Sequence, residues 1–126
     1  MGRLSELSKV DLEAARGKLM DIMCYYQGYK QVNLILVFDA YKVTGNAGEA
    51  FDYHNIRVVF TKEAETADQY IEKLVRDIGK TCDVTVATSD GLEQLMVMGG
   101  GAKRLSAGNL RDEVQLMEQE IRDKYL

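Results

Sequence analysis

The chain has 126 residues, of which 46% are hydrophobic and 29% are charged, a composition typical of one globular domain with a substantial core. The formal net charge of −4 argues against binding of nucleic acid through overall charge, although it leaves room for a local basic face. His54 is the only histidine, which argues against histidine-based catalysis and zinc binding.

No apolar run approaches the roughly 18 residues needed to cross a membrane, and the amino terminus lacks the apolar region of a secretory signal. We therefore expect a cytoplasmic protein that does not bind membranes. Cys24 and Cys82 have no metal-type spacing, and we expect two buried or half-buried thiols in a reducing compartment.

The first half of the chain predicts one helix and two strands. Apolar residues recur with a 3.6-residue period over residues 4–27, with Ser8 or Asp11 as a cap at an early break and Gly28 as the stop. The apolar run over residues 32–38 predicts a strand buried on both faces, hence a parallel sheet. Residues 41–53 have no period and predict a surface loop, and residues 56–60 predict the second strand.

The second helix is predicted over residues 66–79. Thr66 and Gln69 fit a capping box, which places Asp68 in the first turn, and Gly79 closes the helix. A third strand is expected over residues 83–87.

Residues 90–98 carry Leu92, Leu95 and Met96 at helical spacing and predict a short helix. Residues 103–106 read as a basic link or a short edge strand, and Ser106 or Asn109 caps a final amphipathic helix. The alternation of strands and helices predicts an α/β fold with right-handed crossovers.

Acidic residues follow each predicted strand. Asp39 follows the first, Glu65 and Asp68 follow the second, and Asp90 follows the third. The carboxyl ends of parallel strands meet at one edge, where α/β sheets place their ligands. Converging carboxylates repel one another, and a hard divalent cation such as Mg²⁺ or Mn²⁺ relieves that repulsion. This pattern indicates a metal-dependent nuclease.

Each carboxylate also has a purely structural interpretation. Asp39 fits a turn cap, Asp68 favours the positive end of a helix, and Asp90 with Glu93 fits a second capping pair. Glu63, in the same turn as Glu65, is interpreted as a surface charge. The repetition at three strand ends favours a site.

Three segments of the chain resemble the YacP-like branch of the NYN domains, which are relatives of the PIN-domain ribonucleases. They are residues 34–40 (LILVFDA), 59–68 (VFTKEAETAD) and 86–90 (VATSD). The resemblance extends over nearly the whole chain, including residues 26–29 and the glycine-rich segment before residues 105–107.

The resemblance implies one domain over residues 1–126, a three-layer α/β/α PIN-like fold with a mainly parallel central sheet. It implies an endoribonuclease with Mg²⁺ or Mn²⁺, and ribosome-bound messenger RNA as substrate, since a bacterial member cleaves it there. By motif match, Asp68 and Asp90 bind the metal, Asp39 is a further acidic member, Glu65 is an outer ligand, and Ser89 orients Asp90 or a water of the ion.

One departure from the family stands out. Members begin with a strand that runs into a Val-Asp-Gly-Tyr-Asn type segment, whose aspartate is a principal metal ligand, and this chain has no such segment. We expect a domain without that strand and carboxylate, as in a truncated, alternative-start or divergent member or a piece of a longer protein, and self-association through the exposed sheet edge. The alternative function is a non-catalytic RNA- or ribosome-binding module.

Basic and aromatic residues are candidates for RNA contacts. Lys103, Arg104 and Arg111 lie near the triple glycine at 99–101 and suit phosphate, although a solvated basic link explains them equally well. Five tyrosines are candidates for base stacking, of which the first two are expected rather to pack the first helix: Tyr25, Tyr26, Tyr29, Tyr41 and Tyr53.

Overall fold

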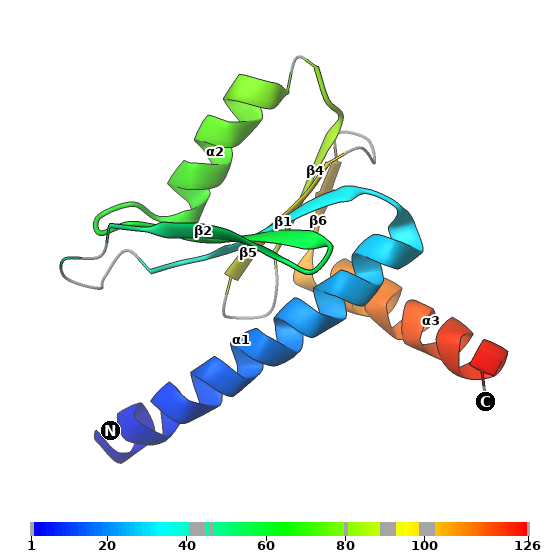
Figure 1. Cartoon of the computed structure of the whole chain (residues 1–126), viewed down its shortest axis with the longest axis horizontal. Coiled ribbons are helices and arrows are strands. Elements are labelled where there is room, and N and C mark those ends of the chain that lie inside the picture. Colours follow the sequence, from blue (N-terminus) through cyan, green and yellow to red (C-terminus); the bar gives the residue numbers. More distant parts are fainter. Residues whose placement is uncertain are drawn as a thin grey trace.

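The computed structural model describes the backbone of residues 2–40, 45, 47–79, 81–88, 93–98 and 103–125, and the side chains of residues 13–40, 45, 47–79, 81–88 and 104–124. These residues form three layers (Figure 1). A six-stranded sheet carries helices α1 (Gly2–Lys30) and α3 (Ala107–Tyr125) on one face and helix α2 (Ala67–Ile78) on the other. The predicted α/β/α class is confirmed.

The sheet contains the three predicted strands, β1 (Asn33–Phe38), β3 (Ile56–Phe60) and β4 (Val84–Thr88), and the edge strand β6 (Lys103–Leu105). These four run in one direction, whereas β2 (Glu49–Tyr53) and β5 (Glu93–Met98) run the opposite way, in the order β2-β3-β1-β5-β4-β6. The sheet is therefore mainly parallel in strand direction, but only β1–β3 and β4–β6 are parallel neighbours.

Two segments have a different secondary structure from the predicted one. The segment predicted as a short helix, residues 90–98, contributes β5, which pairs antiparallel with both β1 and β4. Pairing on both sides satisfies its backbone and overrides a helical spacing that a short apolar run carries only weakly. The predicted loop 41–53 ends in strand β2, which pairs with β3; residues 41–44 and 46 lie outside the described residues.

Helix α1 runs without a break past Ser8 and Asp11, and Gly28 lies inside it, so the predicted break and stop were wrong. The helix ends where Gln31 adopts a left-handed conformation (φ 58°) and donates its N–H to the Gln27 carbonyl at 2.8 Å. The side-chain amide of Gln31 also donates to the Gly28 carbonyl at 2.7 Å. These two bonds satisfy the carbonyls of Gln27 and Gly28, two of the last four in the helix, without a glycine cap.

The caps of the other two helices follow the sequence. Thr66 Oγ1 accepts the N–H of Gln69 at 3.1 Å, and the Gln69 side chain accepts the N–H of Thr66 at 2.9 Å, so the predicted capping box is present. Ser106, rather than Asn109, caps α3: its hydroxyl accepts the N–H of Asn109 at 3.1 Å.

Each face of the sheet has its own apolar core. Leu36, Phe38 and Val58 pack against α1 and α3, whereas Val37 and Val59 pack against α2. Side chains alternate between the two faces along each strand, so the apolar runs 32–38 and 56–60 cover both.

Helix α1 is joined to α3 through Glu113. The Tyr26 hydroxyl donates to Glu113 at 2.7 Å, and the Lys30 ammonium lies 3.1 Å from the other carboxylate oxygen. Burial alone raises the pKa of Glu113, but the hydrogen bonds from Tyr26 and Lys30 and the charge of Lys30 outweigh it, so the pKa is lowered overall. Burial and the bond to Glu113 raise the pKa of Tyr26.

Exposure corrects two expectations from sequence. Tyr26 is buried as expected, but Tyr25 is 66% exposed and does not pack the helix. Cys24 is half-buried, whereas Cys82 is exposed. Tyr53 belongs to β2 and donates to Asp21 at 2.6 Å. None of the helices in the described ranges is long and apolar enough to cross a membrane.

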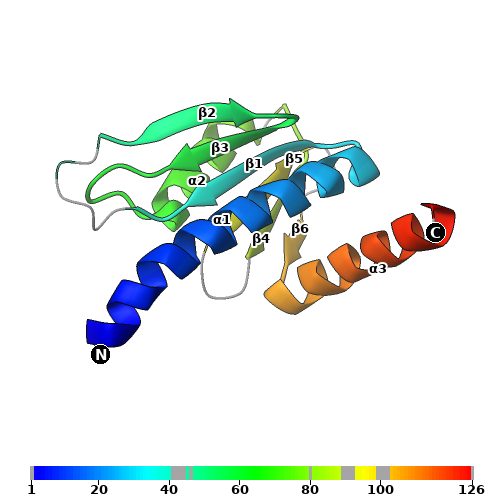
Figure 2. The ribbon, with the colours of Figure 1, turned by 60° about the horizontal axis from the view of Figure 1, so that its bottom comes forward.

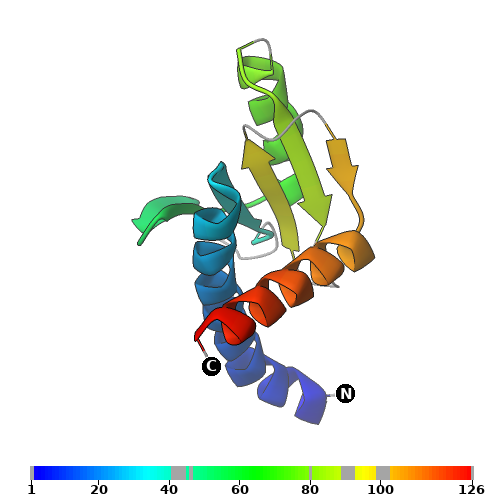
Figure 3. The ribbon, with the colours of Figure 1, turned by 90° about the vertical axis from the view of Figure 1, so that its right-hand side faces the viewer.

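The length of α1 matters for the candidate site. Its 29 residues span about 43 Å, against about 20 Å for the six residues of β1. Because α1 runs antiparallel to β1, its amino-terminal half extends beyond the carboxyl ends of the strands (Figures 2 and 3).

Candidate metal and nucleic-acid site

The carboxyl ends of β1 and β3 are fastened together by Thr61. Its N–H donates to the Phe38 carbonyl at 3.1 Å, and its hydroxyl accepts the N–H of Ala40 at 2.9 Å. Thr61 is only 1% exposed. The two bonds reach the residues on either side of Asp39, so the backbone that carries this carboxylate is held in place.

Asp39 is half-buried, and its Oδ1 atom is buried without a hydrogen-bond partner among the described residues. Side chains alternate between the two faces of the sheet along β1, and Val37 faces α2. Asp39, two residues further on, therefore occupies the next position on the α2 side. A buried carboxylate oxygen without a partner carries a desolvation cost that a bound cation removes. Asp39 therefore fits the predicted role of a metal ligand.

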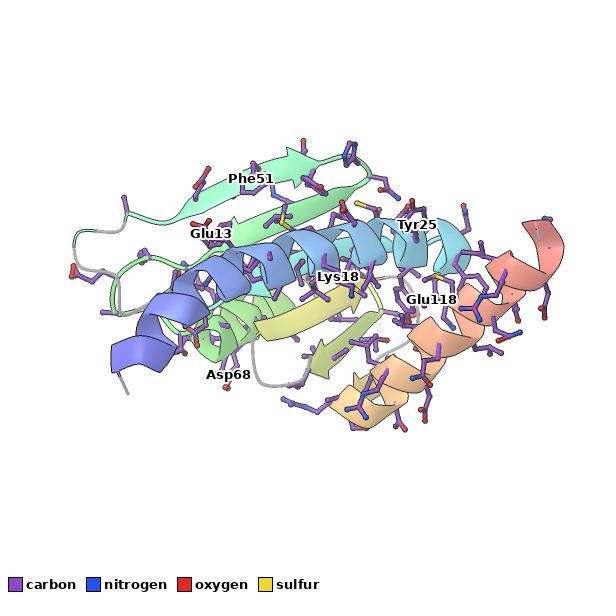
Figure 4. The ribbon with its side chains drawn as sticks, turned by 90° about the horizontal axis from the view of Figure 1, so that it is seen from below. Glu13, Lys18, Tyr25, Phe51, Asp68 and Glu118 are labelled. Carbon is purple, nitrogen blue, oxygen red and sulfur yellow. The ribbon has the colours of Figure 1, made fainter. Side chains whose placement is uncertain are left out.

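The turn from β3 to α2 carries the next two carboxylates. The Glu65 N–H donates to the Lys62 carbonyl at 3.0 Å, with Ala64 between them in the left-handed region (φ 69°). Glu65 is half-buried, and Asp68 is exposed in the first turn of α2. Figure 4 shows Asp68 at the end of the molecule opposite Tyr25 and Glu118.

Glu63, in the same turn, is exposed, and its carboxylate accepts the N–H of Gly45 at 3.1 Å. Its interactions are those of a surface residue that fixes a neighbouring loop position. Asp39, Glu65 and Asp68 thus come from two adjacent strand ends at one edge of the sheet.

The fourth predicted carboxylate cannot be placed with the other three. Ser89 and Asp90 follow Thr88, the last residue of β4, and lie outside the described residues. Within the described side chains, no group of three or more acidic, cysteine or histidine residues is close enough to hold a metal. Strand β5 lies between β1 and β4, which separates these two strands by about 10 Å.

Strand β5 brings Glu93 to this edge, a residue that the sequence analysis did not assign to the site. Glu93 begins β5 and is the register partner of Phe38, so its backbone lies at the edge that carries Asp39. The sequence indicated Glu93 only as a capping partner of Asp90. A strand assignment for residues 93–98 would have placed it here.

Of the basic residues predicted to bind RNA, the two whose side chains the structure describes lie on different surfaces. Arg104 lines a hollow of about 440 Å³ on the α2 side, together with Asp83 and Val86. Arg111 is exposed on α3, which covers the opposite face, and the side chain of Lys103 is outside the described set. Each of the two described arginines therefore serves a different surface.

Comparison with known proteins identifies the protein family to which this chain belongs. The model of the YacP-like NYN domain matches residues 1–126, and the chain belongs to this family. The protein YacP of Bacillus subtilis (strain 168) is 41% identical over 120 residues, which make up 94% of this chain and 70% of YacP. A crystal structure of a mutant of Rae1 (YacP) from Bacillus subtilis superposes with a TM-score of 0.69 at 34% identity, covering 98% of this chain and 72% of that one.

Proposed function

We propose that this chain is a metal-dependent endoribonuclease that cleaves RNA phosphodiesters at the carboxyl edge of its sheet. The observation that carries the proposal is the buried Oδ1 of Asp39, which has no hydrogen-bond partner in the part of the chain that the structure describes, at an edge that also carries Glu65 and Asp68. Oxygen ligands of this kind suit Mg²⁺ or Mn²⁺. Membership of the NYN family, whose fold is that of PIN-like ribonucleases, supports the same reaction class.

The proposed roles of the acidic residues are those that the resemblance to the family implies. Asp39 and Asp68, with Asp90, hold the cation, Glu65 assists as an outer ligand, and Ser89 orients Asp90. When bound, Mg²⁺ or Mn²⁺ lowers the pKa of a water molecule and neutralises charge on the phosphate.

The chain's own contribution is to hold these groups in position. Thr61 fixes the backbone beside Asp39, and the capping box of Thr66 and Gln69 fixes the turn that presents Asp68. Positioning of this kind is a large part of the catalytic effect when a phosphoryl centre is attacked by water. Lys103, Arg104 and Arg111 are the proposed phosphate contacts outside the acidic edge.

We place the activity in the cytoplasm, with messenger RNA on the ribosome as the substrate. This part of the proposal rests on the resemblance to the YacP-like family. It requires that the acidic edge reach RNA while the rest of the chain contacts the ribosome, and the exposed Asp68 meets the first requirement.

The second candidate is a non-catalytic RNA- or ribosome-binding module. Two observations favour it: the described side chains include no group of three metal ligands, and β5 separates the ends of β1 and β4. In that case the acidic edge would bind at most a weakly held cation and would not cleave RNA.

Cleavage of RNA by the purified chain separates the two candidates. The wild type is incubated with RNA in Mg²⁺ or Mn²⁺ and in a chelator, beside Asp68→Asn and the control Asp77→Asn, an exposed carboxylate in the last turn of α2. The nuclease predicts metal-dependent cleavage by the wild type and by the control, and loss of cleavage in Asp68→Asn with the fold intact. RNA binding without cleavage by the wild type would favour the second candidate, and undiminished cleavage by Asp68→Asn would remove the assignment.

A further inference from the structure

A hollow on the α2 side of the sheet lies between α2 and strands β4 and β6, of which β6 forms one edge of the sheet (Figure 3). Its volume is about 440 Å³, and binding sites for small molecules range from roughly 300 to 1,000 Å³. Ile71 and Val75 of α2 and Val84 and Val86 of β4 line it with apolar side chains. Because Ile71 and Val84 belong to the core on this face, packing holds the apolar wall in place.

Three charged side chains also line the hollow. Glu72 comes from α2, Asp83 lies directly before β4, and Arg104 belongs to β6. All three are exposed, and within the described ranges none of these side chains has a hydrogen bond or an ion pair. Arg104 is the register partner of Val86, so it lies beside part of the apolar wall. The hollow therefore offers a ligand two carboxylates, one cation and an apolar surface.

These groups define the chemistry of a ligand that fits. Apolar side chains suit the face of a flat ring, carboxylates accept hydrogen bonds, and a guanidinium suits a phosphate. A nucleotide combines a planar base, N–H groups at the edge of the base, and a phosphate. Among the RNA bases, guanine alone presents two neighbouring N–H donors on its Watson–Crick edge, and these match the two oxygens of one carboxylate.

The position of the hollow suits a substrate that also reaches the acidic edge. Val86 precedes Thr88, the last residue of β4, by two positions, or about 7 Å along the strand. Val84 and Val86 face α2, and Asp39 follows β1 on the same side of the sheet. One RNA strand can therefore place a base in the hollow and a phosphate at the acidic edge.

We infer that the hollow binds a guanine nucleotide, with the base against the apolar wall, its N–H edge on Glu72 or Asp83, and its phosphate on Arg104. A guanosine within RNA and a free guanine nucleotide share this chemistry, and the proposed function makes the guanosine of RNA the occupant. The inference thus rests on the proposed RNA substrate. It adds a base preference and leaves the metal ligands as assigned.

The test compares pentauridine with the same pentanucleotide carrying a central guanosine, and guanosine monophosphate with uridine monophosphate, in a chelator that prevents metal-dependent cleavage. Calorimetry at several salt concentrations measures the affinities. Cys82 gives a second measurement because it lines the hollow and is exposed, so a bound ligand slows its alkylation by iodoacetamide. The half-buried Cys24 on α1 is the internal control.

Two variants remove the proposed contacts. The double variant Glu72→Ala/Asp83→Ala removes both carboxylates, and Arg104→Gln removes the cation. The matched controls Asp77→Ala and Arg57→Gln change exposed residues of the same charge that do not line the hollow.

We expect the wild type to bind the guanosine pentanucleotide about tenfold more tightly than pentauridine, since one bidentate pair discriminates between bases to this order. The bound guanosine pentanucleotide should slow alkylation of Cys82 and leave that of Cys24 unchanged. The double variant should lose the preference. Arg104→Gln should keep it, bind both pentanucleotides more weakly, and lower the slope of log affinity against log salt by about 0.7. Both controls should match the wild type.

Equal affinity of the wild type for the two pentanucleotides, with no protection of Cys82, would overturn the inference, as would a preference that persists in the double variant. Protection of Cys82 by guanosine monophosphate but not by the guanosine pentanucleotide would overturn RNA as the source of the nucleotide. If the double variant does not fold, the affinities and alkylation rates of the wild type decide the question.

Failure of the proposed function gives a different pattern. A wild type that cleaves RNA in Mg²⁺ or Mn²⁺ without any preference for guanosine would overturn only the guanine site. A wild type that never cleaves, yet prefers the guanosine pentanucleotide and protects Cys82 with it, would overturn the nuclease and support the guanine site.

Discussion

The hydroxyl of Thr61 accepts the backbone N–H of Ala40 at 2.9 Å, across the ends of two parallel strands. Ala40 follows Asp39 directly, and the N–H of Thr61 reaches back to the carbonyl of Phe38 on the other side. One buried threonine thus holds the backbone on both sides of the carboxylate whose buried oxygen has no hydrogen-bond partner within the described ranges. The acidic edge depends on this contact because it decides where Asp39 lies.

Replacing Thr61 by valine tests that dependence. Valine has the same shape but no acceptor, so the N–H of Ala40 loses its partner, and we expect the free energy of unfolding to fall by about 1–3 kcal/mol. We also expect weaker Mn²⁺ binding, because the Asp39 backbone is released. Denaturant unfolding and calorimetry measure the two effects. Thr61→Ser keeps the hydroxyl and should retain Mn²⁺ affinity; equal loss in both variants would contradict the bracketing role.

The capping box predicts a second, smaller effect. Thr66→Ala removes the acceptor for the Gln69 N–H and should lower the free energy of unfolding by about 1 kcal/mol. Because the cap fixes the turn that presents Asp68, cleavage of RNA should fall as well. Lys73→Ala, at an exposed position in the middle of α2, is the control and should change stability by less than about 0.5 kcal/mol. Equal stability of Thr66→Ala and wild type would argue against the cap.

The junction of α1 and α3 predicts a pH dependence. The folded-state pKa of Glu113 is lowered, since the bonds from Tyr26 and Lys30 outweigh its burial. Its contribution to stability is therefore complete above the pKa of an unfolded glutamate, about 4.3, and is lost as the pH falls through the lower folded value. Glu113→Gln should be less stable than wild type at neutral pH, and the difference should shrink in acid.

Unfolding by denaturant at several pH values measures this difference. Glu118→Gln, an exposed carboxylate on the same helix, should stay close to the wild type throughout. A difference between Glu113→Gln and wild type that is the same at neutral and acid pH would contradict the role given to the Glu113 charge.

The sequence predicted the elements whose signals are local and strong. The apolar runs at 32–38 and 56–60 gave β1 and β3 because both faces of these strands are buried. Thr66 and Gln69 predicted the start of α2 because a capping box lies within four consecutive residues. These elements place Asp39, Glu65 and Asp68 at one edge, so the location of three of the four candidate carboxylates could be inferred from the sequence.

The missed elements depend on pairing that no local pattern reveals. The sequence of residues 93–98 is compatible with either a helix or a strand. These residues form a strand because they pair with β1 on one side and with β4 on the other. Strand β2 is an edge strand with Glu49, Ala50 and Asp52 exposed, so its apolar pattern is weak.

The most direct test of the proposed metal site is a calorimetric titration with Mn²⁺ of the wild type, Asp39→Asn, and the control Asp52→Asn in β2. Asp52 is an exposed carboxylate near Arg57, away from the acidic edge. If Asp39 is a metal ligand, we expect the wild type and Asp52→Asn to bind Mn²⁺ with the same affinity. Folded Asp39→Asn should bind at least about tenfold more weakly, a loss of about 1.4 kcal/mol. No Mn²⁺ binding by the wild type, or equal binding by Asp39→Asn, would contradict it.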